Sequence, residues 1–118
     1  RRWVVIEAKL HAALSPICQA FPDVATNGTT APWCTYQQYA GRDLSYIEQT
    51  LPKERAAAFQ VSVWAKTRSE ATTLALRIEA ALLATAMQVM PEGGILATTD
   101  VETGLRGAIQ RFLIHDDR

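Results

Sequence analysis

The most constraining feature of this sequence is a strand pattern that runs directly into a helix start signal. Residues 57–66 alternate between apolar side chains and small or polar ones, which is the two-residue period of a strand with one buried face. Thr67 and Glu70 then match a capping box, in which Thr67 caps the first turn and Glu70 reaches back to it. We expect the helix that follows to be buried against the apolar face of the strand, around Phe59 and Val61. Its apolar stripe consists of Ala71, Leu74, Ala75, Ile78, Ala81 and Leu82.

A second amphipathic helix is predicted at the start of the chain. Its apolar residues recur three or four positions apart, which places them on one stripe. Pro16 ends the helical pattern, because it disfavours helical geometry at Ser15 and has no N–H to donate. The stripe consists of Ile6, Leu10, Ala13, Leu14 and Ile17.

Three further strands are predicted from shorter patterns. Residues 33–39 are rich in aromatic and β-branched side chains, residues 87–90 form a short strand-like run, and residues 105–114 are typical of a closing strand. The pattern does not assign the inward face of the closing strand, because Arg111 interrupts its apolar residues. Turn-forming residues separate these segments at residues 21–32, 91–94 and 100–104.

Together these elements predict an α+β fold. Turns short enough for hairpins favour an antiparallel sheet, and two helices with one apolar stripe each are best buried together on one sheet face. We predict a single two-layer domain over residues 1–118, with a mostly antiparallel sheet of four to five strands and two helices packed on one face. Gln60, Ser62 and Trp64 would then lie on the opposite face, which is half apolar and suited to packing against a neighbouring molecule.

Charge and hydropathy argue against several classes of function. The 118 residues include 12 Lys and Arg and 12 Asp and Glu, so the formal net charge is zero. A nucleic-acid binder normally carries a basic excess, because neutralising phosphates supplies most of its affinity. No apolar stretch approaches the length needed to span a bilayer. We therefore expect neither recognition of a nucleic-acid sequence nor a membrane role, whereas a zero net charge permits self-association.

Two cysteines are the first candidates for chemistry. Cys18 and Cys34 have neither a CxxC spacing nor companions at a metal-binding spacing. One disulfide between them is conceivable, but small apolar thiols in a reducing compartment are the favoured interpretation. A cysteine nucleophile would need a histidine within hydrogen-bond reach. His11 lies off the helical stripe and is expected at the surface, and His115 is expected in a frayed polar tail.

Carboxylate pairs and nucleotide-binding motifs give no stronger signal. Asp100 with Glu102, and residues 116–117, fall in loop or tail sequence, where solvated charges are expected. The glycines at residues 93–94 are too few for a phosphate loop. We therefore predict no catalytic residue, no cofactor-binding residue and no metal site.

Five segments, taken in their order and spacing, carry a family resemblance. The segments are residues 13–16 at the end of the first helix, residues 21–25 ahead of a strand preceded by Pro32, residues 36–41, residues 59–65 leading into residues 69–71, and residues 100–106 before the last strand. In these segments the chain resembles the tail-completion proteins of long-tailed bacteriophages and prophages, also called head-to-tail joining or tail-terminator proteins. No single segment is diagnostic, because the patterns are structural and include no catalytic signature.

The resemblance implies a structural virion protein with no enzymatic activity and no cofactor. Such a subunit would form a ring of its own copies, implied to be a hexamer, that caps the phage tail tube and joins it to the head connector or neck protein. It would be assembled in the cytoplasm of the bacterial host and become part of the virion. Two rival functions stay open: a small ligand-binding regulatory domain of two-layer α/β build, which would show a deep apolar pocket, and an enzyme that uses Cys34 or Cys18.

A long segment before the central strand is the predicted contact region. Residues 41–55 are long for a loop in a compact domain and mix charges of both signs with apolar side chains. Aromatic residues are enriched at interfaces, so Trp64 on the exposed sheet face is a further candidate. The predicted subunit or partner interface consists of Arg42, Asp43, Tyr46, Ile47, Lys53, Arg55 and Trp64.

Overall fold

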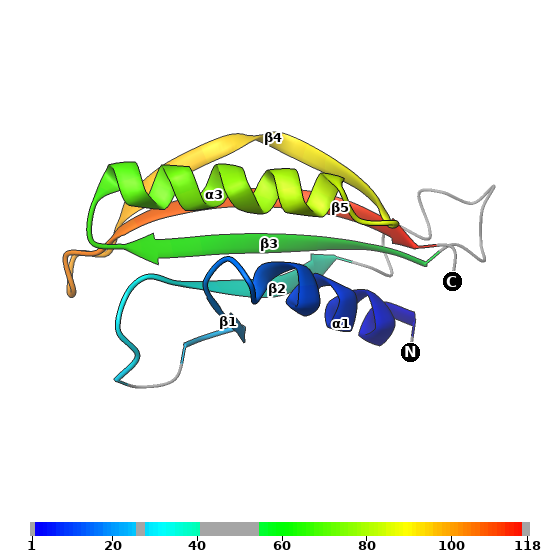
Figure 1. The fold of residues 1–118 in the computed structure, drawn as a ribbon, viewed down its shortest axis with the longest axis horizontal. Coiled ribbons are helices and arrows are strands. Elements are labelled where there is room, and N and C mark those ends of the chain that lie inside the picture. The colour runs from blue at the N-terminus through cyan, green and yellow to red at the C-terminus, as the bar shows by residue number, and fades with distance from the viewer. Residues whose placement is uncertain (1, 26–27, 41–54, 117–118) are drawn as a thin grey trace.

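The computed structural model describes residues 2–25, 28–40 and 55–116, which form two helices and five strands (Figure 1). The order along the chain matches the predicted alternation of one helix, a group of strands, a second helix and two closing strands. The elements are α1 (Arg2–Leu14), β1 (Gln19–Pro22), β2 (Trp33–Ala40), β3 (Arg55–Ala65), α3 (Arg68–Leu83), β4 (Gln88–Thr99) and β5 (Arg106–Asp116).

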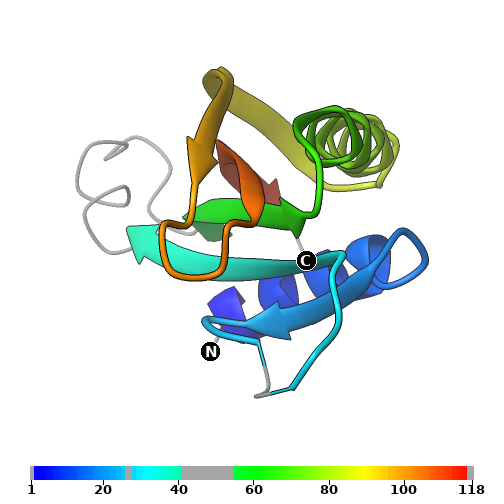
Figure 2. The ribbon, with the colours of Figure 1, turned by 90° about the vertical axis from the view of Figure 1, so that its left-hand side faces the viewer.

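The five strands form one sheet in the order β1-β2-β3-β5-β4. β1 pairs with β2 in parallel, and the other three neighbouring pairs are antiparallel. Helices α1 and α3 contact each other and pack on the same sheet face, in front of the sheet in Figure 1. In Figure 2, α3 lies to the right of β4 and β5, and no described helix covers their left side. The predicted α+β fold of two layers with a mostly antiparallel sheet is confirmed.

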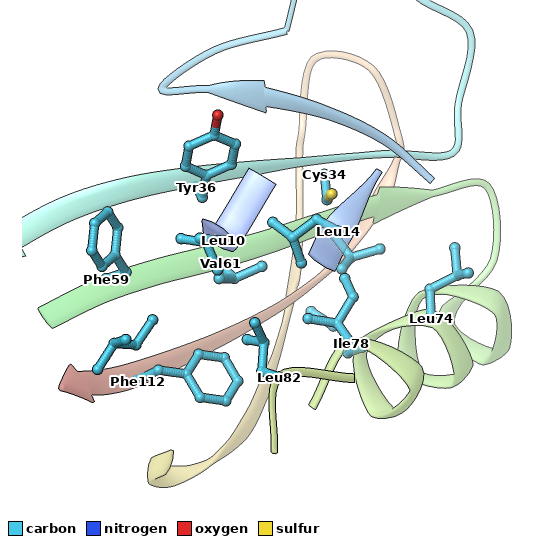
Figure 3. Packing of buried hydrophobic residues seen from close by; sticks show 14 of the residues in the cluster. Leu10, Leu14, Cys34, Tyr36, Phe59, Val61, Leu74, Ile78, Leu82 and Phe112 are labelled. Atoms are coloured by element: carbon cyan, nitrogen blue, oxygen red, sulfur yellow. The ribbon is translucent and has the colours of Figure 1, made fainter. Parts of the chain in front are cut away.

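The strand–helix unit forms where the sequence pattern predicts it. The N–H of Glu70 donates to Thr67 Oγ1 at 3.1 Å, so Thr67 is the N-cap of α3. The apolar stripe of α3 is buried against the sheet, which holds the helix in place. The side chain of Ile78, in this stripe, is only 1% exposed. Figure 3 shows the stripe facing the side chains of β3 and β5. The buried members of the stripe are Ala71, Leu74, Ala75, Ile78 and Leu82.

Helix α1 closes the other half of the same core. It ends at Leu14, two residues before Pro16, as the proline predicts. Ser15 Oγ donates to the His11 carbonyl at 2.9 Å and so satisfies one of the last carbonyl groups of the helix. Three side chains one turn apart are completely buried, namely Ile6, Leu10 and Leu14.

Two strands differ from the prediction. β1 was not predicted: it begins before the segment predicted as turns and extends two residues into it, and its four residues gain a parallel partner in β2. The turn predicted at residues 91–94 is wrong, because β4 continues through it as a strand of 12 residues. Pro91 is tolerated there since β4 is an edge strand, where a missing N–H leaves no neighbour unpaired. A β-bulge between Glu92 and Leu96 accommodates Gly93 with a φ of +86°.

The structure also assigns the inward face of β5. Ala108, Phe112 and Ile114 are buried toward the helices together with Gln110. The amide of Gln110 Nε2 donates to Glu79 Oε2 at 3.2 Å and to the Gly93 carbonyl at 3.4 Å. Because Gln110 is polar and Ala108 is small, the inward-facing residues of β5 do not give a clear alternating apolar pattern in the sequence.

The end of β5 corrects a second prediction. His115 does not lie in a frayed tail, because β5 continues to Asp116 between β3 and β4. His115 is paired with Ala56 of β3 and with Gln88 of β4, and its side chain is half-buried.

Candidate interaction surface

The sheet face opposite the two helices is not covered by a described helix, and we call it the open face. Residues directly opposite each other on antiparallel strands point to the same side, so the strand register groups the open face into rows. The rows are Trp33, Trp64, Gly107 and Thr98; Thr35, Ser62, Ile109 and Leu96; Gln37, Gln60, Arg111 and Glu92; and Ala58, Leu113 and Met90.

The first row is held together by an aromatic ring. A Cβ atom placed on Gly107 would lie 2.6 Å from Cζ3 of Trp64 and 2.8 Å from Cγ2 of Thr98. The Trp64 ring therefore lies directly over the Gly107 backbone, in space that only a glycine leaves open. Trp64, predicted as an interface residue, is on the open face, but part of its surface is already used within its own sheet.

The third row is a polar cluster that crosses the sheet. Arg111 Nε donates to Gln60 Oε1 at 3.2 Å, and the Arg111 guanidinium carbon lies 4.9 Å from the ring centroid of Tyr39. The Tyr39 hydroxyl donates to Glu92 Oε1 at 2.5 Å. Burial, reinforced by this hydrogen bond and the Glu92 charge, raises the pKa of Tyr39 to about 12. Tyr39 is consequently a protonated donor at neutral pH, and the row presents fixed charges of both signs.

Apolar side chains flank this cluster along β4. Leu96 is 68% exposed and Met90 is 61% exposed, both on the open face. Leu96 borders a surface groove of about 360 Å³ where β4 bulges away from β5. Exposed apolar groups beside ordered charges also occur together at protein interfaces, so this part of the open face is the candidate interaction surface. The groove is lined by Gln60, Glu92, Gly93, Gly94, Leu96, Ile109, Gln110 and Arg111.

The structure describes only part of the predicted interface. Trp64 is placed on the open face, and Arg55 is the first residue of β3, paired with Asp116. Reasoning from sequence missed the cluster of Tyr39, Glu92 and Arg111, although the interruption of the β5 pattern by Arg111 was a signal that it belongs to an exposed face. Five predicted residues lie outside the described residues, namely Arg42, Asp43, Tyr46, Ile47 and Lys53.

Two of the residues considered for catalysis, His11 and Asp100, make contacts within the fold. The expected surface position of His11 is wrong, because its half-buried ring lies edge-on to Tyr36 at 5.7 Å, with Nδ1 2.9 Å from the tyrosine hydroxyl. Asp100 organises the β4–β5 turn, where its carboxylate accepts from the Glu102 N–H at 3.2 Å and from the Thr103 hydroxyl at 2.9 Å. Within residues 2–25, 28–40 and 55–116, no group of three or more His, Cys, Asp and Glu side chains is placed to hold a metal ion.

The interior between α3 and the sheet is filled. The cavity bordered by Val61, Ile78 and Phe112 has a volume of about 10 Å³, roughly the space of one water molecule. Ligand pockets usually measure about 300–1,000 Å³, so this cavity cannot admit a small organic molecule. In the part of the chain that the structure describes, neither helix is long and apolar enough to cross a membrane.

Comparison with known proteins adds one finding. The model of a family described as tail completion protein gp17 matches residues 6–114. The match therefore spans every described strand and both helices rather than a local motif. A search of curated proteins gave no match.

Proposed function

Because this chain belongs to the tail completion protein gp17 family, a family of structural phage tail proteins, we propose that it is a ring subunit that caps the tail tube and joins it to the head connector. Membership of the family gives the chain a role in phage tail assembly and makes it a component of the virion. We further propose that the ring is a hexamer, that its partners are the tail tube protein and the head connector, and that it assembles in the host cytoplasm. The match over residues 6–114 is the observation that carries it.

The described surface supports a role in assembly. A head-to-tail contact between identical subunits closes into a ring when its rotation returns to the first subunit, and otherwise continues as a filament. The open face has the components of such a contact: exposed Leu96 and Met90 supply apolar area, and Glu92 and Arg111 supply opposite charges in a fixed arrangement. Opposite charges set the register of a contact more than its affinity, which suits a chain with no net charge.

The rival ligand-binding function would need an enclosed apolar pocket. The interior cavity of about 10 Å³ argues against it. The larger groove is open to the surface, since its border residue Leu96 is 68% exposed. The filled interior therefore favours a subunit that binds other proteins through its exterior.

A matched pair of substitutions tests the proposal. Leu96→Glu places a charge on the open face, whereas Leu76→Glu places the same charge on the outer side of α3, where Leu76 is 52% exposed. Both positions are at the surface, so both variants should fold. We expect native mass measurements and electron microscopy to show rings for the parent and for L76E, and single subunits for L96E.

The same two variants should differ in their ability to complete tails in a functional assay. In an extract from cells infected by a phage that lacks this protein, L76E should complete tails and L96E should not. If L96E forms rings and completes tails as the parent does, the open face is not the subunit contact. If the parent itself neither forms a ring nor completes tails, the proposed function is wrong.

A further inference from the structure

The fold brings together the only two cysteines of the sequence, although 15 residues separate them in the chain. The parallel register places Ala20 of β1 opposite Cys34 of β2. Cys18 lies one residue before the start of β1, where its N–H donates to the Leu14 carbonyl at 3.2 Å. Cys34 is completely buried in the core, and Cys18 is half-buried and packs against that core. Figure 3 shows Cys34 among the buried side chains near Leu14 of α1.

The two thiols are in direct contact. Cys34 donates its S–H hydrogen to the sulfur of Cys18. This hydrogen bond lowers the pKa of Cys18 despite its partial burial, and the Arg77 guanidinium acts in the same direction. The same hydrogen bond, together with burial, raises the pKa of Cys34. The pair thus combines an accessible thiol that ionises readily with an inaccessible one that keeps its proton.

We propose that Cys18 and Cys34 form a reversible redox site, which a low-molecular-weight disulfide oxidises to an intramolecular disulfide bond. The inference rests on the register of β1 and β2 and on the contact between the thiols. It is independent of the proposed role in tail assembly.

The reaction consists of two thiol–disulfide exchanges. The Cys18 thiolate attacks one sulfur of the small disulfide, a mixed disulfide forms at Cys18, and one small thiolate leaves and takes up a proton. The Cys34 sulfur then attacks Cys18 Sγ, and the proton of Cys34 passes to the departing small thiolate. The mixed disulfide breaks and the second small thiol leaves. Two electrons pass from the cysteine pair to the reagent, which is reduced to two thiols.

The expected consequence is a stronger attachment of the sheet edge. β1 has only four residues and pairs with a single strand, β2. A bond between Cys18 and Cys34 would close the connection from the end of α1 to β2, which restricts the unfolded chain more than the folded one. For a loop of this size we expect the melting temperature to rise by roughly 10 °C.

Mass spectrometry of the full chain tests the site directly. The reduced protein is incubated with mixtures of reduced and oxidised glutathione, quenched with an alkylating reagent and weighed after denaturation. The expected product has lost two hydrogens, carries no alkyl group and is a monomer on a non-reducing gel. A protein that stays alkylated at both thiols in excess oxidised glutathione would overturn the proposal, as would a stable glutathione adduct or a disulfide-linked dimer.

Two variants identify the order of attack. Cys34→Ala should stop at one glutathione on Cys18, because nothing resolves the mixed disulfide. Cys18→Ala should remain unmodified while folded, because Cys34 is buried. A glutathione adduct on Cys34 in folded C18A would refute the assigned order. Circular dichroism verifies the fold of each variant, and the result for the parent chain decides the proposal even if a variant fails to fold.

Discussion

Substituting Gly107 by alanine tests whether the Trp64 ring is fixed on the open face as the structure places it. The new Cβ would meet Cζ3 of Trp64 at 2.6 Å and Cε3 at 2.9 Å. Ordinary contacts begin at 3.4 Å, so the ring must move by roughly 0.8 Å or swing away from the sheet. Thr98 Cγ2, at 2.8 Å from the same position, limits movement on the other side.

The magnitude follows from the size of this overlap. Overpacking of a well-filled site destabilises a protein by about 1–3 kcal/mol. We expect Gly107→Ala to lower the free energy of unfolding by that amount, since Gly107 is buried and its strand is paired on both sides. If the overlap with Trp64 is the cause, then Trp64→Ala should remove most of the penalty. A double-mutant cycle should show a coupling of about 0.5–3 kcal/mol between the two positions.

Urea unfolding followed by circular dichroism measures all four members of the cycle. Gly94→Ala is the matched control, because a Cβ at Gly94 has no atom within 4 Å and the residue has no left-handed φ. The control should be neutral or stabilising by up to about 1 kcal/mol. Equal stability of G107A and G94A, or penalties that simply add in the double variant, would show that Trp64 does not lie over Gly107.

Three other predictions use different parts of the structure. Ile78→Ala should reduce the free energy of unfolding by about 2–5 kcal/mol in urea melts, whereas Leu76→Ala on the exposed side of α3 should change it by less than about 0.5 kcal/mol. Because the pKa of Tyr39 is raised from 10 to about 12, its contribution to stability is complete below pH 10 and is lost as the pH rises toward 12. Tyr39→Phe should remove that part of the alkaline loss, so parallel decline of both proteins would count against the contact with Glu92. Replacing residues 43–52 by a short Gly-Ser bridge should leave a folded monomer that neither forms rings nor completes tails, and unchanged assembly would exclude this segment from the interface.

The sequence predicted the elements whose signals are local. The strand pattern of β3 and the Thr67 cap of α3 depend on residues within one or two turns of each other, and Pro16 ends α1 by its own covalent structure. The family resemblance was also confirmed, because it used order and spacing along the chain rather than contacts. Local rules sufficed wherever an element's stability arises within the element itself.

Elements that depend on distant partners were missed or misjudged. β1 has four residues with no pattern of its own and exists because β2 pairs with it. The extension of β4 through Pro91 is possible only at a sheet edge, which the sequence cannot place. The contact between Tyr39 and Glu92 joins residues that are 53 positions apart in the sequence. No local sequence motif could therefore predict the polar cluster of the open face.

The two sheet edges bear on how such a subunit associates. An edge strand with unpaired N–H and C=O groups invites addition of another strand, which can repeat without limit. Here β1 is short and ends at Pro22, and β4 contains Pro91 and a bulge at Gly93, so neither edge offers a long regular row of donors and acceptors. Edges of this kind resist strand addition, whereas a closed ring needs one specific contact with a fixed rotation. Side-chain contacts on the open face, with Leu96 exposed beside ordered charges, fit that requirement better than either edge.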